Sequence, residues 1–292
     1  MGYYKYLKRN LAFRIPHGKT VIDIGPGHAP LIRADVLCDR YPLETKQRPI
    51  PAIYIPKGRF VVGDIQDLPF LDQSFDFAYC SAVLEHLKEP DRACREITRI
   101  AKAGLIRVPS SLWETMGGSE AHLWLVHLEN NTLVFRRKTV EDTRLNSLIP
   151  ERIRNSKAYE KLFDTFYADF FIDYHWKGHI PFEIKGLDLP GLYEFSESED
   201  ASFMGDKELY HHMMMKKGPM RFLKTKIFAA LRHLLGGKDI LLETVLACPV
   251  CKKGLKPQNS QKTYCPACNL YYPVIGEVPI LLKEAAIPAS ER

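Results

Sequence analysis

Residues 21–30 read VIDIGPGHAP, and this stretch decides the fold. A short apolar run carries one acid, Asp23, and then breaks at Gly25, Pro26 and Gly27. A strand that ends in a glycine-rich turn is a place where the backbone can approach a ligand closely. Glycine spacing of this kind also occurs in ordinary turns, so the interpretation depends on what the neighbouring segments carry.

Four further segments among the first 110 residues have the composition of buried strands: 35–39, 59–63, 75–80 and 104–108. Residues 91–103 (DRACREITRIAKA) place apolar side chains on one helical face, and Pro90 suits the first turn of that helix. Strands alternating with a helical pattern predict a parallel α/β sheet. Two connections depart from that scheme. The first has room for little more than a turn, and residues 40–58 contain four prolines, which disfavour a crossover helix.

Polar or small residues follow each of these predicted strands. Asp39 ends the second strand and Asp64 follows the third, while CSAVLEH (80–86) and RVPSS (107–111) end the fourth and fifth. In open parallel sheets, ligands collect at the carboxyl ends of the strands. An acid at the end of the second strand is suited to accept hydrogen bonds from ribose hydroxyls.

The series VIDIGPG, VLCD, VVGDIQDLPF, SFDFAYCSAVLEHL and GLIRVPS resembles the class I methyltransferases that use S-adenosylmethionine, over about residues 18–112. The resemblance implies an α/β fold with a doubly wound, mostly parallel seven-stranded sheet that ends in an antiparallel hairpin. It also implies cofactor contacts for eight residues: Asp23, Gly25 and Gly27 around the methionine part, Asp39 at the ribose, Asp64 and Ile65 at the adenine, and Cys80 and Ser81 near the methionine moiety. Ala29 stands where many members have a third glycine.

Methyl transfer to a hydroxyl calls for a group that takes the hydroxyl proton. The candidates near the strand ends are Glu85, His86, His122 and His127. We rank His122 first, because the segment after the fifth strand usually covers the acceptor pocket in the family. For His86, the alternative to catalysis is a purely structural role. For His127, the alternative is a position on a solvent-exposed face of the hairpin.

Beyond residue 110 the sequence pattern changes. Residues 121–138 (AHLWLVHLENNTLVFRRK) predict a hairpin with Asn130 and Asn131 at the bend. Residues 151–172 predict an aromatic-rich helix, which we interpret as lid or core, and 174–187 predict extended segments.

The C-terminal segment contains two Cys-x-x-Cys pairs separated by 13 residues: Cys248, Cys251, Cys265 and Cys268. Four thiolates satisfy a tetrahedral ion, for which zinc is the default and a mononuclear iron site the alternative. LLETVLACPVC, CNLYYPV and GEVPILL resemble the small zinc-ribbon activator that partners methyltransferases acting on tRNA and release factors. The resemblance implies that the ribbon docks on its own methyltransferase domain, although docking on a third protein is an alternative.

Composition and charge set the wider expectations. The chain has 292 residues and a net charge of +6, with 46% hydrophobic and 26% charged residues, as in globular proteins. We expect a methyltransferase domain over 1–215, a basic amphipathic linker over 216–239 and a zinc ribbon over 240–292. No signal peptide, myristoylation pattern or spanning run is recognisable, so we expect a cytoplasmic protein.

The predicted function is methyl transfer from S-adenosylmethionine to an oxygen or nitrogen of an acceptor, with a small-molecule or glycan hydroxyl preferred. A tRNA or protein acceptor is one alternative, and an inactive scaffold of methyltransferase fold is another. CSAVLEH lacks the Asn-Pro-Pro-Tyr motif of amide and exocyclic amine methylation. Residues 216–238 hold seven Lys or Arg and no acid, so peripheral contact with an anionic membrane is a further hypothesis.

Overall fold

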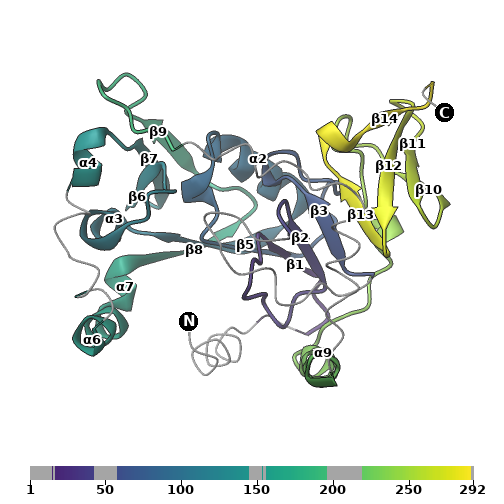
Figure 1. Ribbon diagram of the computed structural model, residues 1–292, viewed down its shortest axis with the longest axis horizontal. Helices are drawn as coiled ribbons and strands as arrows, with labels where there is room; N and C mark the ends of the chain where they lie inside the picture. Colours follow the sequence, from purple (N-terminus) through teal and green to yellow (C-terminus); the bar gives the residue numbers. More distant parts are fainter. Residues whose placement is uncertain are drawn as a thin grey trace. The chain divides into compact units, whose positions relative to one another are not determined.

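The computed structural model describes residues 15, 17–42, 58–144, 153, 156–195 and 219–290, and of residues 219–226 it describes the backbone only. The chain divides into two compact units (Figure 1). Unit 1 combines Met1–Tyr79, Arg99–Lys102 and Ser198–Arg292, and unit 2 combines Cys80–Thr98 with Ala103–Glu197. The proline-rich connection over 40–58 lies largely outside the described residues.

Unit 1 is built on short parallel strands that are buried along their whole length. β1 (Val21–Ile24) pairs in parallel with β2 (Val36–Asp39), and β2 pairs in parallel with β3 (Phe60–Gly63). Every residue of these three strands is buried, as expected for strands covered on both faces. β4 (Phe77–Ser81) follows on the other side of β1 and runs into unit 2. The strands predicted from the sequence are confirmed, and turns without a helix connect β1 to β2.

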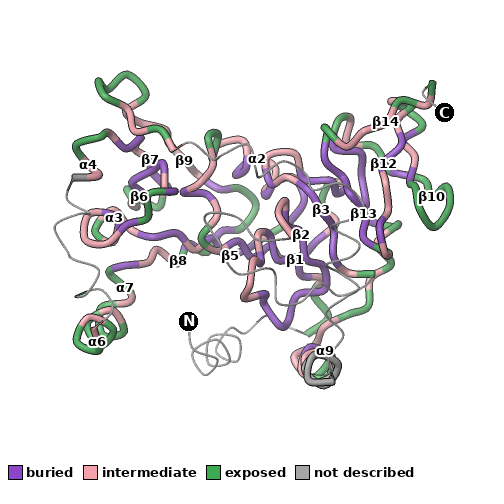
Figure 2. Tube along the Cα trace, viewed as in Figure 1, coloured by how far each residue is buried: buried purple, intermediate pink, exposed green. Residues whose placement is uncertain are grey.

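The C-terminal module joins the same sheet through one strand. Its strands are β10 (Lys256–Asn259), β11 (Lys262–Cys265), β12 (Leu270–Ile275), β13 (Val278–Leu281) and β14 (Ile287–Pro288). They pair antiparallel among themselves, but β13 also pairs in parallel with β3, with Ile280 opposite Val62 and Leu281 opposite Gly63. Figure 2 shows β3 and β13 in the colour of buried residues. The module thereby covers the outer edge of β3.

Two short helices flank this junction, η1 (Ile65–Asp67) and η6 (Lys283–Ala285), and a third, η5 (Leu242–Thr244), leads into the first Cys pair. Backbone bonds reinforce the contact: Ala247 N donates to Pro69 O at 2.9 Å, and Leu71 N donates to Val245 O at 2.9 Å. The Asp67 carboxylate of η1 forms an ion pair with Lys283, with Nζ 2.7 Å from Oδ1. Docking of the module on the parallel sheet therefore combines strand pairing, backbone bonds and charge.

The predicted linker contains helix α9 (Pro219–Leu234), and a buried ion cluster anchors its end. The Asp35 carboxylate, fully buried, accepts from Arg33 Nη1 at 3.1 Å and from Arg232 Nη1 at 3.3 Å. On this predicted amphipathic linker, the apolar side chains of Ile227 and Leu234 are exposed. Arg232 is buried and paired, so it does not contribute charge to a membrane-facing surface; membrane contact by the rest of the segment stays a prediction.

Unit 2 holds an antiparallel strand pair and a second, three-stranded sheet. β5 (Ala103–Pro109) pairs antiparallel with β8 (Phe171–Lys177). The predicted hairpin is confirmed as β6 (Trp124–Glu129) and β7 (Thr132–Arg137), with positive φ at Asn130 and Asn131. β9 (Phe182–Lys185) adds in parallel to β7. The hairpin therefore builds a sheet of its own, and the antiparallel partner of β5 is β8.

The helices of unit 2 follow local sequence signals. α2 (Pro90–Ile100), whose last two residues belong to unit 1, begins at its proline, while Ser110 and Ser156 cap α3 (Ser111–Gly117) and α6 (Lys157–Thr165). The remaining helical segments are η2 (Leu84–His86), α4 (Val140–Arg144) and α7 (Tyr167–Phe170). Trp113 packs edge-on to Phe163 with the ring centroids 4.9 Å apart, so aromatic residues of α6 contact α3. The helix predicted over 151–172 is interrupted between α6 and α7, and its last two residues begin β8. Among the described helices, none combines the length and the apolar character needed to cross a membrane.

We expect Ile280→Ala to destabilise the protein by about 2–5 kcal/mol, because Ile280 is fully buried opposite Val62 and truncation leaves a cavity. Denaturant unfolding of the full chain measures the loss. Ile227→Ala is the matched control, since Ile227 is 44% exposed on α9. Equal stabilities for the two variants would contradict the assignment of β13 to the core.

Candidate functional site

Asp23, near the end of β1, holds the two ends of the following glycine loop together. Gly25 and Gly27 have φ of +67° and +51°, in the left-handed region that favours glycine. Asp23 is buried, and its Oδ2 accepts from Leu31 N at 2.6 Å, at the far end of the loop. A buried carboxylate is costly unless it is hydrogen-bonded. Asp23 therefore fixes the path of the glycine loop, which explains an acid inside an apolar strand.

Asp39 connects the ends of β1 and β2. Its Oδ2 accepts from Gly27 N at 3.0 Å, and its Oδ1 accepts from Tyr41 N at 2.8 Å. The structure thus brings Asp39 and the glycine loop into direct contact, as their positions at strand ends predict.

Asp64 lies at the end of β3 and has two protein partners. Its Oδ1 accepts from Gln66 N at 2.8 Å and caps η1, which begins at the buried Ile65. Its Oδ2 pairs with Arg40, and Arg40 Nη2 also donates to Glu284 Oε1 of the C-terminal module at 2.5 Å. Burial works to lower the pKa of Arg40, but Asp64, Tyr41 and Glu284 together outweigh it, so the pKa is raised. The sequence analysis missed Arg40 and Glu284, which lie 244 positions apart.

In unit 2, Cys80 and Ser81 end β4, and Cys80 is buried. The next residue, Ala82, has φ of +56°, and its N–H donates to Arg107 O at 2.8 Å. A left-handed conformation is uncommon for alanine and marks a constrained turn. This turn leads into η2, which carries two of the predicted catalytic residues.

Glu85, His86 and His122 form one cluster in unit 2. His122 Nε2 lies 3.9 Å from Glu85 Oε1, and the two imidazole centroids are 4.5 Å apart. His86 Nδ1 lies 3.1 Å from Ala121 O, and His122 Nδ1 lies 2.5 Å from Glu114 Oε1. The structure brings together these three residues, each of which the sequence analysis names as a separate candidate, and their chemical role is taken up below.

Two residues that the sequence analysis missed support the cluster. Glu114 Oε2 accepts from Lys138 Nζ at 3.0 Å, and both side chains are fully buried. Glu114 is therefore shared between Lys138 and His122. His127, by contrast, lies on the exposed end of β6, where its Nε2 is 2.9 Å from Glu129.

Burial shifts the pKa of two residues in this cluster, Glu85 and His86. It raises the pKa of Glu85 to about 7, although nearby His122 works to lower it. It lowers the pKa of His86 to about 3, with a further contribution from His122. His86 is therefore neutral at physiological pH.

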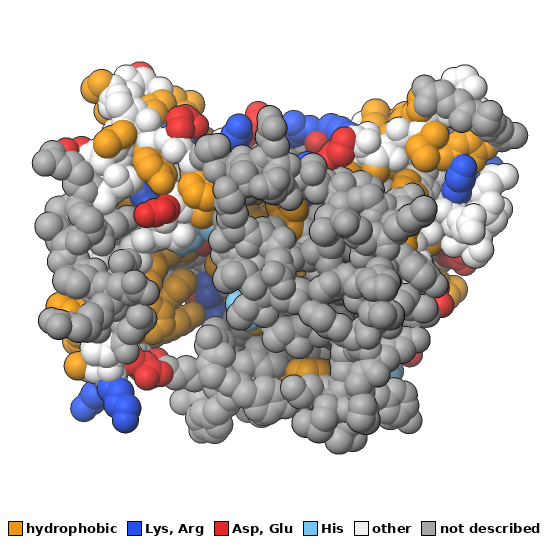
Figure 3. Space-filling view, in the orientation of Figure 1, with side chains coloured by type: hydrophobic (Ala, Val, Ile, Leu, Met, Phe, Trp, Pro, Cys, Tyr) orange, Lys and Arg blue, Asp and Glu red, His pale blue; other side chains and the backbone are white. Residues whose placement is uncertain are grey.

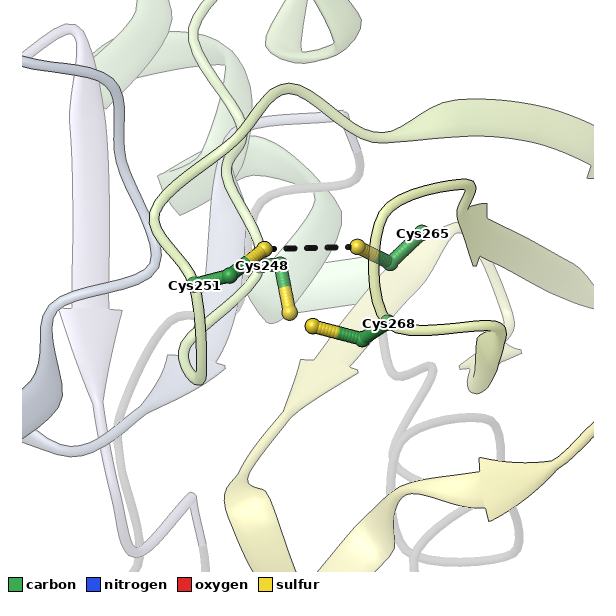
Figure 4. Close-up of side chains that lie close together, drawn as sticks. All are labelled: Cys248, Cys251, Cys265 and Cys268. Carbon is green, nitrogen blue, oxygen red and sulfur yellow. Dashed lines mark hydrogen bonds between the residues drawn. The ribbon is translucent and has the colours of Figure 1, made fainter.

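The four tail cysteines converge from two loops (Figure 4). Their sulfur atoms all lie within 4.8 Å of one another, and Cys251 Sγ is 3.5 Å from Cys265 Sγ. Tyr272 Oη lies 3.3 Å from Cys248 Sγ inside the module. An ion with metal–sulfur bonds of about 2.3 Å holds its sulfur atoms about 3.8 Å apart in tetrahedral geometry. The donor set and its spacing fit such an ion.

Comparisons with known proteins connect both parts of the chain to families. The family model described as a methyltransferase domain matches residues 37–106. A UPF0434 protein from Nitrosococcus oceani is 47% identical over 49 residues, 16% of this chain and 83% of that protein. A UPF0434 protein from Methylobacillus flagellatus is 38% identical over 56 residues, 18% of this chain and 93% of that protein. The second match therefore spans nearly a whole relative.

Among solved structures, the complex between the Haloferax volcanii Trm112 methyltransferase activator and a methyltransferase is 26% identical with a TM-score of 0.29, over 36% of this chain and 52% of that one. An S-adenosylmethionine-dependent methyltransferase from Mesorhizobium loti is 13% identical with a TM-score of 0.30, over 59% of this chain and 75% of that one. The chain thus spans about half the length of the first of these solved chains.

The fold class is the α/β class I methyltransferase fold with a small C-terminal zinc-ribbon-like module, as the sequence predicts. Its parallel strands β1 to β3, the glycine loop and the acids at the strand ends lie in or directly before the matched family segment. The chain carries a class I S-adenosylmethionine-dependent methyltransferase domain, and through its C-terminal module it belongs to the UPF0434 protein family.

Proposed function

We propose that the protein transfers the methyl group of S-adenosylmethionine to an oxygen or nitrogen of an acceptor, preferably a hydroxyl of a small molecule or glycan. The observation that carries this proposal is the hydrogen bond from Gly27 N to Asp39, which joins the glycine loop after β1 to the acid that ends β2. That arrangement suits a ligand that has both a charged amino-acid part and a ribose.

Residues at different strand ends would contact different parts of the cofactor. Asp39 would accept the ribose hydroxyls, while Asp64 and Ile65 would border the adenine. Asp23, Gly25 and Gly27 would shape the loop around the methionine part, which Cys80 and Ser81 would also approach. When bound, the cofactor supplies a methyl group already activated by its sulfonium, so the protein's task is to position the acceptor and exclude water.

On the acceptor side, His122 is our candidate for the base, with Glu85 and His86 beside it. Glu114 holds the Nδ1 edge of His122, which leaves Nε2 to take a proton. Lys138 in turn fixes Glu114. A base held in one tautomer by a carboxylate suits a hydroxyl acceptor, whose proton must leave as the methyl group arrives.

The described charges on one face of the molecule bear on the choice between a small acceptor and nucleic acid. On the described surface of the face in Figure 3, Lys and Arg side chains form separate small groups among acidic and apolar ones. Nucleic-acid-binding surfaces concentrate basic residues on one face or along one stripe. A tRNA or protein acceptor is the alternative that the experiment below separates.

We also infer that Cys248, Cys251, Cys265 and Cys268 hold a structural zinc ion. Four protein ligands close the coordination sphere, so the ion would stabilise the module rather than act on a substrate. A module of this size has little core of its own, and metal binding would supply much of its folding free energy. Pairing of β13 with β3 supports a ribbon that serves its own methyltransferase domain.

A methyl-transfer screen with labelled cofactor tests the function. Cell fractions enriched in RNA, protein, glycan, lipid and small molecules are offered in parallel, and we expect the label in the glycan or small-molecule fraction. Label in RNA or protein would reassign the acceptor. Cofactor binding without transfer to any fraction would favour the inactive scaffold.

We expect Asp39→Ala to weaken S-adenosylmethionine binding by about 10-fold to 100-fold, the value of one or two hydrogen bonds to a charged group. Isothermal titration calorimetry measures the affinity. Asp72→Ala is the matched control, because the Asp72 side chain is 71% exposed, and it should bind as the wild type does. A wild-type protein that binds no cofactor would overturn the proposed activity.

We expect Cys265→Ser to release the ribbon zinc and to lower the midpoint of thermal unfolding, because the module loses its metal and β3 loses a stable neighbour. Elemental analysis and calorimetry measure the two effects. Cys94→Ser is the control, since Cys94 is a buried cysteine of α2 outside the ribbon. Unchanged zinc content in the Cys265 variant would refute the assignment of the ligand.

A further inference from the structure

Glu85, His86 and His122 together have the composition of a metal-binding set. Each offers one ligand atom, and these atoms all lie within 4.8 Å of one another. All three residues belong to unit 2, two from η2 and one from the turn before β6. The set is separate from the four cysteines of the C-terminal module.

Both imidazoles are oriented by their Nδ1 atoms. His86 Nδ1 is placed to donate to Ala121 O at 3.1 Å, and His122 Nδ1 is placed to donate to Glu114 Oε1 at 2.5 Å. Each ring therefore keeps the lone pair of Nε2 for another partner. Histidines that bind metals usually donate their second ring N–H to a backbone carbonyl or a carboxylate in this way.

The third member is a carboxylate that lacks a partner. Glu85 is fully buried, and within the described part of the chain neither of its oxygen atoms has a hydrogen-bond partner. His122 Nε2 lies 3.9 Å from Oε1, beyond hydrogen-bond distance. Buried carboxylates without a partner are costly, and pairing or metal coordination is the usual remedy.

The nearby charges do not supply that partner. Lys138 Nζ lies 3.0 Å from Glu114 Oε2, so the buried cation in this region is paired with Glu114. A divalent cation between Glu85 and the two imidazoles would supply the partner that neither Glu85 oxygen has among the described residues.

We propose that Glu85, His86 and His122 bind a divalent first-row transition-metal ion. Two imidazoles and one carboxylate suit zinc, iron or manganese better than calcium or magnesium, which prefer oxygen ligands. Metal–ligand bonds of about 2.1 Å hold tetrahedral ligand atoms about 3.4 Å apart, so the 3.9 Å between Glu85 and His122 requires only a small side-chain rotation.

Three protein ligands leave at least one coordination position open, as in catalytic rather than structural metal sites. Where the proposed methyl transfer holds, that position would bind the acceptor's oxygen and lower the pKa of its hydroxyl. His122 would then serve as a ligand instead of a base. The binding of the ion itself depends on neither cofactor nor acceptor.

Cobalt(II) titration of the full-length protein, with zinc already in the ribbon, tests the proposal. We expect the wild type to bind one further equivalent of cobalt, with d–d absorption but without the thiolate charge-transfer band that exchange at the ribbon would produce. Glu85→Gln and His122→Ala should each weaken this binding by more than about 100-fold, since even outer-shell changes cost 10-fold to 100-fold. His127→Ala is the control and should bind as the wild type does, because His127 lies outside the cluster.

Circular dichroism melting shows whether each variant is folded, and Glu85→Gln preserves the shape of the side chain. A wild type that takes up no cobalt beyond the ribbon would overturn the proposal, and so would folded Glu85 and His122 variants that bind cobalt as tightly as the wild type. Calorimetry with S-adenosylmethionine is run in parallel. Because it reports on the Asp39 site, loss of cofactor binding is distinguishable from loss of cobalt binding.

Discussion

The parallel pairing of β13 with β3 is the constraint on which unit 1 depends. β3 is buried along its length, and its outer edge would otherwise present unpaired backbone groups. The strand that covers this edge comes from more than 200 residues later in the chain. Closing so long a loop costs entropy before the contact forms, so the C-terminal module must be well ordered for the pairing to persist. The stability of the sheet edge and that of the C-terminal module are therefore coupled.

The same junction reaches the residues at the carboxyl end of β3. Arg40 lies between Asp64 and Glu284, and Lys283 pairs with Asp67 one helical turn further on. Such partly exposed ion pairs are individually worth little in stability. Their effect is geometric, because they hold the segment from Asp64 to Asp67 against the module. The proposed adenine-binding segment is thus shaped by residues of a different part of the chain.

The sequence alone was sufficient to predict the elements that are determined by short, local sequence patterns. The five strands, the helix after Pro90, the Asn130–Asn131 hairpin and the converging cysteines follow from periodicity and spacing. Partners that are distant in sequence could not be predicted in this way. Arg40 with Glu284 and Glu114 with Lys138 join residues whose individual sequence contexts carry no signal of the pairing. The parallel addition of β9 to β7 escaped prediction for the same reason.

The buried charges of the two units differ in a way that bears on function. In unit 1, Asp35 is matched by Arg33 and Arg232, so the cluster fixes the end of α9 at little electrostatic cost. In unit 2, Glu114 is matched by Lys138, but Glu85 is equally buried, and among the described residues neither of its oxygen atoms has a hydrogen-bond partner. Packing alone would favour an apolar residue at that position, since an unpaired buried carboxylate destabilises the fold. Glu85 lowers the stability of the fold, and it lies beside two oriented imidazoles, so its position is best explained by a ligand that it binds. A cation is the ligand that suits a carboxylate and two imidazole lone pairs.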